Sequence, residues 1–208
     1  AMPDDSYTAI QIINEFGAAR GNNTGLPILL PGINLLFGLI GESENNWQKN
    51  IEFLEKVINA SLLLRRINIR QAVYFEHSYL TKNKPKINAQ LKFKFEKYKQ
   101  YIRNNIDNFL LQKIAPLGII LKNVFLEKKD DYLCFGRQFG SYPILVATAE
   151  KLELKQFYDF MIVNHGLRSL TAITQSINLN TIDYSILKTV SGISKKQANK
   201  IIANRPFI

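Results

Sequence analysis

A turn near the C-terminus carries residues suited to holding a phosphate group. Gly192 is followed closely by Ser194, Lys195 and Lys196. Glycine permits a sharp turn, and the backbone N–H groups that begin the next helix can bind an anion with help from the two lysines. Such a contact engages the nucleic-acid backbone and carries no base-sequence information. The alternative is a helical hairpin used only for packing.

The apolar residues around this turn have a regular spacing. We expect a first helix through Thr189, a turn over 190–194 and a second helix over 195–204, with Pro206 beyond it. The pattern resembles the h-x-x-h-x-G-h-G signature of helix-hairpin-helix motifs, except that Ser194 stands where the second glycine is usual. Its positions are Leu187, Val190, Gly192, Ile193, Ala198 and Ile202.

A second group of polar residues alternates with isoleucines. Arg66, Asn68 and Arg70 are separated by Ile67 and Ile69. In a strand this period of two directs the polar side chains to one face and the isoleucines to the other. In a βα-barrel the polar face lines the lumen, where two arginines are costly unless they bind anions or carboxylates. The alternative is an edge strand with solvated arginines.

Basic and aromatic residues are also interleaved in the middle of the chain. The lysines of residues 82–103 alternate with Phe93, Phe95, Tyr98 and Tyr101. This mixture indicates either a helix with solvated lysines and a packed aromatic face, or a track for RNA or DNA. In the β-rich region that follows, the candidates for phosphate or base contacts are Arg137, Tyr142 and Arg168.

Composition narrows the possible classes. The chain has 208 residues, of which 46% are hydrophobic, so it is not intrinsically disordered. No uncharged apolar run approaches the roughly 18 residues of a membrane span. The single cysteine, Cys134, excludes an internal disulfide and an all-cysteine metal site. The net charge of +10 favours polyanions, chiefly nucleic acid, although a lysine-rich proteome explains it equally well.

The first part of the chain alternates helix and strand. We expect helices over 4–18 and 44–59, a buried strand over 33–40 and a second strand over 62–75. This order predicts a right-handed crossover and a parallel sheet. Two strands are too few to close such a sheet, and an open parallel edge invites further strands. We therefore expect this segment to be the end of a larger sheet.

The remainder is predicted to be a helix, a small barrel and the hairpin. The helix over 82–115 has one apolar face formed by Leu91, Phe95, Tyr98, Ile102, Ile106 and Phe109. Short strands are expected over 119–127, 132–138, 142–147 and 157–164, with a hairpin turn over 128–131. Several short strands at close spacing predict a small β-barrel.

Two segments resemble radical S-adenosylmethionine (SAM) enzymes. Residues 33–43, ending in Gly38-Leu39-Ile40-Gly41-Glu42-Ser43, resemble the fifth strand and turn of these enzymes, and residues 65–71 resemble the sixth strand. The β-rich segment resembles a TRAM-type barrel. The resemblance rests on Gly136-Arg137, on Gly140-Ser141-Tyr142-Pro143 and on residues 163–169. The order of modules is similar to the C-terminal portion of an archaeal radical SAM group.

The resemblance implies a cofactor site that this chain only partly supplies. It implies a SAM pocket at Gly38, Gly41 and Glu42, and a [4Fe–4S] cluster held by three cysteines in a CxxxCxxC loop. Because Cys134 is the only cysteine, we expect this chain alone to bind neither group. SAM and the cluster then belong to an assembly completed by a second polypeptide, or by an N-terminal half, that carries three clustered cysteines.

The sequence therefore predicts an α+β protein. Its modules are a partial βα-barrel with an open parallel edge (1–80), a basic helical connector (81–115), a TRAM/OB-like β-barrel (116–174) and a helix-hairpin-helix (175–208). We expect it to bind nucleic acid, RNA rather than DNA, and to be catalytically silent without its partner. The alternatives are a stand-alone nucleic-acid-binding protein with a relic half barrel, or a scaffold. No leader follows Met2, so we expect a cytoplasmic protein without membrane contact.

Overall fold

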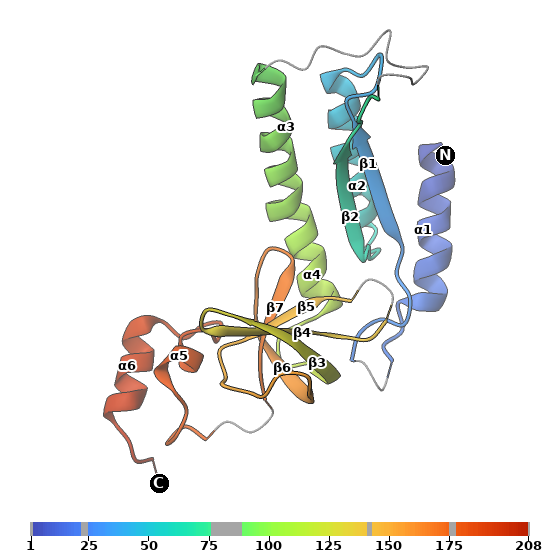
Figure 1. The fold of residues 1–208 in the computed structure, drawn as a ribbon. Coiled ribbons are helices and arrows are strands. Elements are labelled where there is room, and N and C mark those ends of the chain that lie inside the picture. The colour runs from blue at the N-terminus through green and yellow to red at the C-terminus, as the bar shows by residue number, and fades with distance from the viewer. Residues whose placement is uncertain (1, 22–24, 76–88, 141–142, 175–177, 208) are drawn as a thin grey trace. The chain divides into compact units, whose positions relative to one another are not determined.

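A computed structural model describes residues 2–21, 25–75, 89–140, 143–174 and 178–207. The chain folds into two compact units (Figure 1). Unit 1 consists of residues 1–18 and 29–110, and unit 2 of residues 19–28 and 111–208. Within the described residues, no helix is both long and apolar enough to cross a bilayer.

Unit 1 is built on a parallel β-α-β segment. Strand β1 (Gly32–Phe37) is followed by helix α2 (Glu44–Asn59) and strand β2 (Arg66–Gln71). The strands pair in parallel, with Gly32 opposite Arg66 and Phe37 opposite Gln71. Ser43 and Asn46 form a capping box that fixes the start of α2. The expected β-α-β order and parallel pairing are therefore present, with shorter strands than the sequence indicated.

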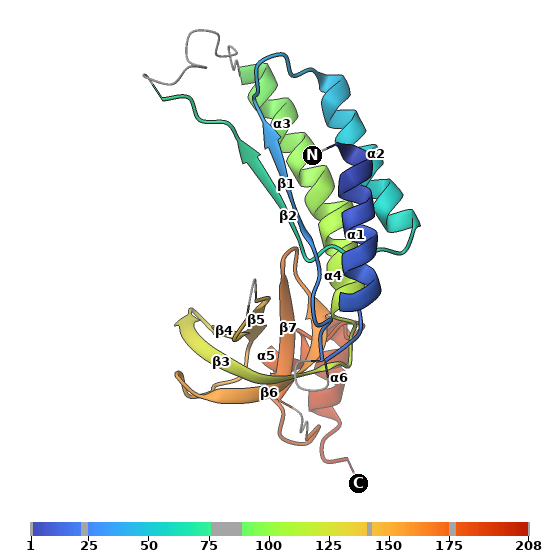
Figure 2. The same cartoon turned by 90° about the vertical axis from the view of Figure 1, so that its right-hand side faces the viewer.

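The helices of unit 1 cover one face of this two-stranded sheet (Figure 2). They are α1 (Pro3–Gly17), α2 and α3 (Ala89–Tyr101). The core beneath them centres on Phe37, whose ring centroid lies 5.6 Å from that of Trp47 and 5.0 Å from that of Tyr98. Edge-on contacts between aromatic rings add stability beyond the burial of their apolar surface.

The other face of the sheet is polar and partly open. Asn68 donates a hydrogen bond of 2.8 Å from its amide nitrogen to the side-chain oxygen of Asn34 on the neighbouring strand. Leu36 is 47% exposed on the same face. In the described part of the chain this sheet has only two strands, so whether it belongs to a βα-barrel remains a prediction.

Helix α3 continues through a π-helical stretch, η2 (Ile102–Asp107), into α4 (Asn108–Ile114). Ile102 and Ile106 are buried as the predicted apolar face requires. Phe109 is instead 41% exposed, and Leu110 is 2% exposed. A π-helical turn contains more residues than an α-helical turn, so it rotates the later positions and brings Leu110 to the core in place of Phe109.

Unit 2 contains a closed five-stranded barrel with the order β3-β4-β5-β7-β6. The strands are β3 (Ile120–Asp130), β4 (Leu133–Gln138), β5 (Leu145–Thr148), β6 (Phe157–His165) and β7 (Ser169–Thr174). All neighbouring strands are antiparallel except β5 and β7, which run parallel. The predicted small barrel is thus present, although its TRAM character remains a prediction.

Two details of the barrel differ from the sequence expectation. Strand β3 extends through Asp130, so the hairpin turns at Asp131 and Tyr132 and not over 128–131. Asp131 has a φ of 54°, a conformation that aspartate tolerates in tight turns. Strand β7, which pairs antiparallel with β6 and parallel with β5, was not predicted from the sequence.

The C-terminal hairpin also belongs to unit 2. Helix α5 (Tyr184–Leu187) begins after Asp183, and α6 (Lys195–Ala203) follows the turn. Leu187 and Ala198 are buried between the two helices. Asp183 is the N-cap residue of α5, and the Asn180 side chain exchanges two hydrogen bonds with the backbone of Phe207.

Candidate nucleic-acid interface

Helix α6 begins with a capping box formed by Ser194 and Gln197. The Ser194 hydroxyl accepts a 3.3 Å hydrogen bond from the Gln197 amide, and the Gln197 side-chain oxygen accepts one of 2.8 Å from the Ser194 amide. These bonds satisfy the backbone amides of Ser194 and Gln197. The amides of Lys195 and Lys196 precede the first intrahelical hydrogen bond, so they point outward from the helix N-terminus.

The residues predicted to contact phosphate lie together at this end. Gly192, Ser194, Lys195 and Lys196 are all exposed. Gly192 has a φ of 85°, a left-handed conformation in which a side chain would be strained. Ser194 has a φ of −72°, so the usual second glycine is not needed for the backbone conformation at this position. The exposed amides, the helix dipole and two ammonium groups form a site suited to an anion.

Hydrogen bonds tie this turn to the barrel. The Ser191 amide donates a 2.8 Å bond to the Val163 carbonyl oxygen on β6. The Asn164 side chain donates a 3.1 Å bond to the Thr189 carbonyl oxygen. The hairpin is therefore attached to a rigid scaffold, which fixes the direction in which its N-terminal amides point.

The predicted barrel residues occupy separate positions. Arg137 lies on β4 and pairs with Glu127, at 2.5 Å between their nitrogen and oxygen atoms. Arg168 is exposed in the turn between β6 and β7. Tyr142 lies outside the described residues. Whether any of these residues contacts nucleic acid remains a prediction.

An aromatic cluster that was not predicted from the sequence lies on the outside of the barrel. The rings of Phe125, Phe139 and Phe157 pack on one another, with centroid separations of 5.1 to 5.6 Å. Phe139 is 74% exposed and Phe157 is 50% exposed. One feature of the sequence could have indicated this cluster. Phe125 alternates with the inward-facing residues Val124 and Leu126, so it lies on the outer face of the strand.

The aromatic residues of α3 divide between core and surface. Tyr98 is buried, and this burial raises the pKa of its hydroxyl group, so the side chain stays neutral. Phe95 packs against the same core. Phe93 is exposed, but the Lys97 ammonium lies 4.6 Å from the centre of its ring. Lys82, Lys84 and Lys86 lie outside the described residues.

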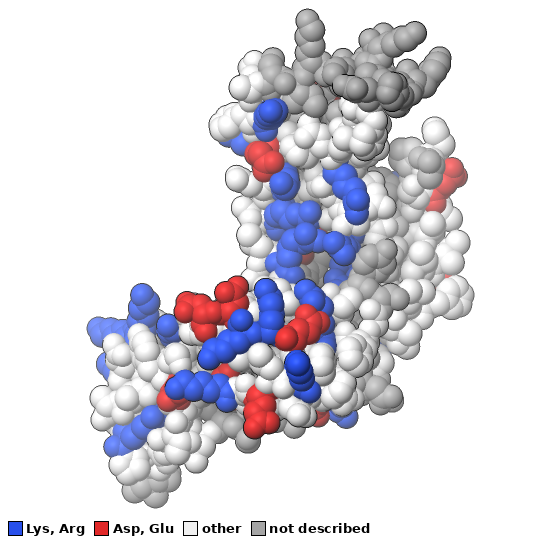
Figure 3. Space-filling view, in the orientation of Figure 1, with Lys and Arg blue, Asp and Glu red and all other residues white. Residues whose placement is uncertain are grey.

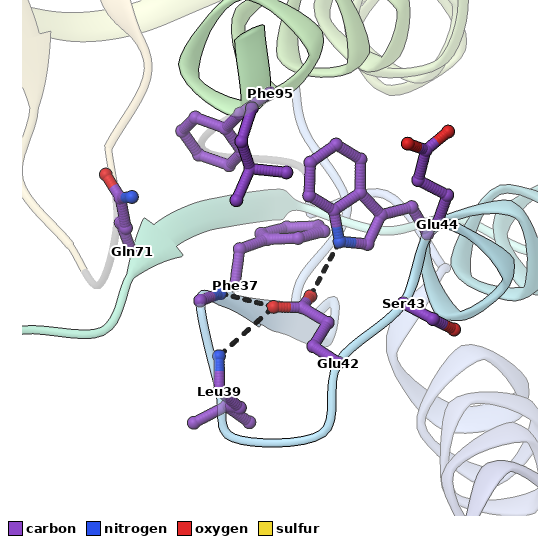
Figure 4. A pocket seen from close by; sticks show the side chains of 10 residues that line it. Phe37, Leu39, Glu42, Ser43, Glu44, Gln71 and Phe95 are labelled. Atoms are coloured by element: carbon purple, nitrogen blue, oxygen red, sulfur yellow. Dashed lines mark hydrogen bonds between the residues drawn. The ribbon is translucent and has the colours of Figure 1, made fainter. Parts of the chain in front are cut away.

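The turn after β1 forms a pocket of about 290 Å³ (Figure 4). Two of the predicted cofactor residues, Gly38 and Glu42, line it beside Trp47 and Phe95, whereas Gly41 lies in the adjoining turn with a φ of 78°. The Glu42 carboxylate points back into its own loop. It accepts hydrogen bonds from the Gly38 amide, from the Leu39 amide at 3.1 Å and from the Trp47 indole at 2.8 Å.

The predicted lumen residues share the polar face of β2. Arg66 and Asn68 are partly exposed and Arg70 is exposed, whereas Ile67 is fully buried on the opposite face. The alternation expected from the sequence is therefore present.

Cys134 lies buried in β4 of unit 2. Among the described residues, no group of three His, Cys, Asp or Glu side chains is placed to hold a metal ion.

The net positive charge is larger in unit 2 than in unit 1. This unit contains 14 Lys and Arg residues against 7 Asp and Glu, whereas unit 1 contains 13 against 10. Figure 3 shows basic side chains on the hairpin, and basic side chains mixed with acidic ones over the barrel. The field around unit 2 therefore favours a polyanion.

Comparison with known proteins agrees with the geometry at the C-terminus. A family model described as a helix-hairpin-helix motif matches residues 173–208. An uncharacterized protein of Methanocaldococcus jannaschii is 45% identical over 171 residues, which cover 81% of this chain and 31% of that protein. One from Archaeoglobus fulgidus is 34% identical over 207 residues, covering 100% of this chain and 38% of its own length. The chain thus spans about a third of the length of these archaeal relatives, and its C-terminal residues form a helix-hairpin-helix motif.

Proposed function

We propose that this protein binds nucleic acid through its C-terminal hairpin, and that single-stranded RNA is its natural ligand. The observation that carries the proposal is the exposed beginning of α6, where Lys195 and Lys196 flank outward-pointing amides in a segment matched as a helix-hairpin-helix motif. Amides at a helix N-terminus bind phosphate oxygens, and the ammonium groups add electrostatic attraction.

The barrel supports the choice of a single strand. Closed five-stranded barrels of this size include OB-folds, which bind oligonucleotides on an outer face. The Ser191–Val163 hydrogen bond holds the hairpin and the barrel in one unit. RNA recognition by proteins is directed mainly at unpaired segments, whose bases are accessible.

The proposal is tested by measuring the affinity of a fluorescently labelled RNA strand with fluorescence anisotropy. We expect the Lys195→Ala/Lys196→Ala variant to bind at least tenfold more weakly at moderate salt, because a hydrogen bond to a charged group contributes about 1.5–3 kcal/mol and 1.4 kcal/mol is tenfold in affinity. The control is Lys49→Ala/Lys151→Ala, which removes the same charge from two exposed positions outside the motif. Equal affinity of the two variants would remove the hairpin from the binding site.

A second proposal concerns unit 1, which we infer to be the end of a larger radical SAM-type βα-barrel. A parallel sheet normally has both faces covered. In the described part of unit 1, no helix lies over the face bearing Asn34, Asn68 and Arg70 (Figure 2). The archaeal relatives contain about twice as much additional sequence as the part aligned here, which is room for further strands.

The residues of this chain do not fit an iron–sulfur cluster. A [4Fe–4S] cluster of this kind needs several thiolates, whereas Cys134 is the only cysteine and is buried in the barrel. The Glu42 carboxylate is already occupied by its own loop and by Trp47. The cluster would therefore have to be held by another polypeptide or by additional sequence, and no reaction step is assigned to this chain.

Purification from the native source tests this second proposal. It predicts that mass spectrometry finds three clustered cysteines, either in additional sequence of the same protein or in a stably associated polypeptide. The following variants test the second case. Arg70→Glu should weaken this association, because it reverses a charge on the uncovered face. Lys49→Glu is the control, since it makes the same reversal on the exposed side of α2. Recovery of the protein with three clustered cysteines neither in its own chain nor in an associated polypeptide would contradict the proposal.

A further inference from the structure

The three phenylalanines on the barrel are held together by strand pairing. Phe125 on β3 is the register partner of Phe157 on β6 and of Arg137 on β4. Phe139 follows β4 directly, and its ring centroid lies 5.6 Å from that of Phe125 and 5.4 Å from that of Phe157. The cluster, here called the phenylalanine platform, is therefore built on paired strands and has a fixed shape.

The platform is exposed although it consists of large apolar side chains. Phe139 has 74% of its surface accessible to solvent, and Phe157 has 50%. Single exposed apolar residues are common in folded proteins, but contiguous apolar groups usually mark a binding surface. Flat aromatic rings offer a surface on which other rings stack.

The charges around the platform do not favour phosphate groups. Arg137 is the nearest basic residue in the strand register, and it is paired with Glu127. Asp159 lies two residues from Phe157 on β6 and accepts a hydrogen bond of 2.8 Å from the Asn123 amide. Because positive and negative groups are nearly balanced here, a ligand gains little from Coulomb attraction to the platform and must gain from contact with the rings.

Unit 2 thus combines two different surfaces. The hairpin presents amides and ammonium groups, which suit phosphates, and the platform presents aromatic rings, which suit bases. We propose that the phenylalanine platform stacks the unpaired bases of the same single strand whose backbone the hairpin binds. This inference rests on the proposed function, and it adds a contact that selects single strands, because the bases of a duplex already stack on one another.

The test compares three variants with two labelled ligands, an oligouridine strand and a blunt RNA duplex of equal length. We expect Phe139→Ala/Phe157→Ala to weaken strand binding by roughly 5- to 100-fold, the range measured for loss of base stacking. Duplex binding should be unchanged, and so should the salt dependence of strand binding, because the phosphate contacts remain. Phe139→Tyr should retain the affinity for the strand.

Phe16→Ala serves as the control, since Phe16 is 75% exposed on α1 of unit 1. Thermal unfolding of each variant confirms that the exposed substitutions leave the barrel folded. If the double phenylalanine variant binds the strand as the native protein does while the lysine pair weakens it, the inference is wrong and the proposed function stands. If neither set of substitutions alters binding, both are wrong.

Sedimentation of the same variants distinguishes a protein ligand. If the native chain self-associates, and Phe139→Ala/Phe157→Ala abolishes this association without affecting the oligouridine affinity, the platform is a contact between copies of the chain. That outcome overturns the stacking inference. Loss of strand affinity with unchanged sedimentation supports it.

Discussion

The amide of Ser191 lies 2.8 Å from the carbonyl oxygen of Val163, so the turn of the hairpin is bonded to strand β6 of the barrel. A second bond joins Asn164 of the same strand to the Thr189 carbonyl oxygen at 3.1 Å. Because both bonds come from neighbouring residues of one strand, they fix the orientation of the hairpin and not only its distance from the barrel.

Asn164→Ala is predicted to loosen the hairpin. The substitution removes the hydrogen bond to Thr189, which contributes about 1 kcal/mol. Hydrogen exchange should become faster at the amides of α5 and α6 and stay unchanged in the centre of β3. Asn199→Ala, at an exposed position of α6, provides the comparison. Unchanged exchange in the hairpin would show that the attachment does not depend on this bond.

Ser194→Ala is predicted to destabilise the protein by about 1 kcal/mol through loss of the helix cap. Ser194→Gly should cost only a few tenths of a kcal/mol, because glycine is itself tolerated at this position. The measurement is chemical unfolding monitored by circular dichroism. A larger loss for glycine than for alanine would contradict the capping role of the hydroxyl group.

Gly136→Ala is predicted to destabilise the barrel by about 1–3 kcal/mol. A Cβ atom at this position would lie 2.4 Å from the Phe125 carbonyl oxygen, and the backbone of β3 cannot move without disturbing the strand pairing. Gly32→Ala is the matched control in β1, where a Cβ atom would lie 3.4 Å from the Arg66 carbonyl oxygen. If both variants lower the free energy of unfolding by the same amount, β3 and β4 do not approach each other closely at Gly136.

Arg20→Ala is predicted to destabilise unit 2 by about 1–3 kcal/mol. The guanidinium group donates hydrogen bonds to the carbonyl oxygens of Gly25, Lys113 and Ile114, and the last two end helix α4. Arg20→Lys should recover only part of the loss, because an ammonium group cannot reach several carbonyl oxygens in the planar geometry of arginine. Thermal unfolding of the two variants measures the difference, and full recovery with lysine would indicate that charge alone matters.

Local patterns predicted those parts of the molecule that depend on neighbouring residues. Gly192 and the apolar positions around it indicated the hairpin, and the alternation of Arg66, Asn68 and Arg70 indicated the two faces of β2. Features that depend on distant pairing were missed. Phe125 and Phe157 are neighbours only because β3 pairs with β6. The parallel pairing of β7 with β5 likewise joins segments that are distant in sequence. The exchange of Phe109 for Leu110 in the core follows from η2, which sequence periodicity does not indicate.

The salt dependence of RNA binding is the most direct test of phosphate contact at the hairpin. The logarithm of the association constant falls linearly with the logarithm of salt concentration, with about 0.7 in slope for each phosphate contacted on a single strand. We therefore expect Lys195→Ala/Lys196→Ala to reduce the slope by about 1.4 relative to the native protein. Lys49→Ala/Lys151→Ala should keep the native slope. A native slope in the first variant, or equal reductions in both, would contradict binding at the hairpin.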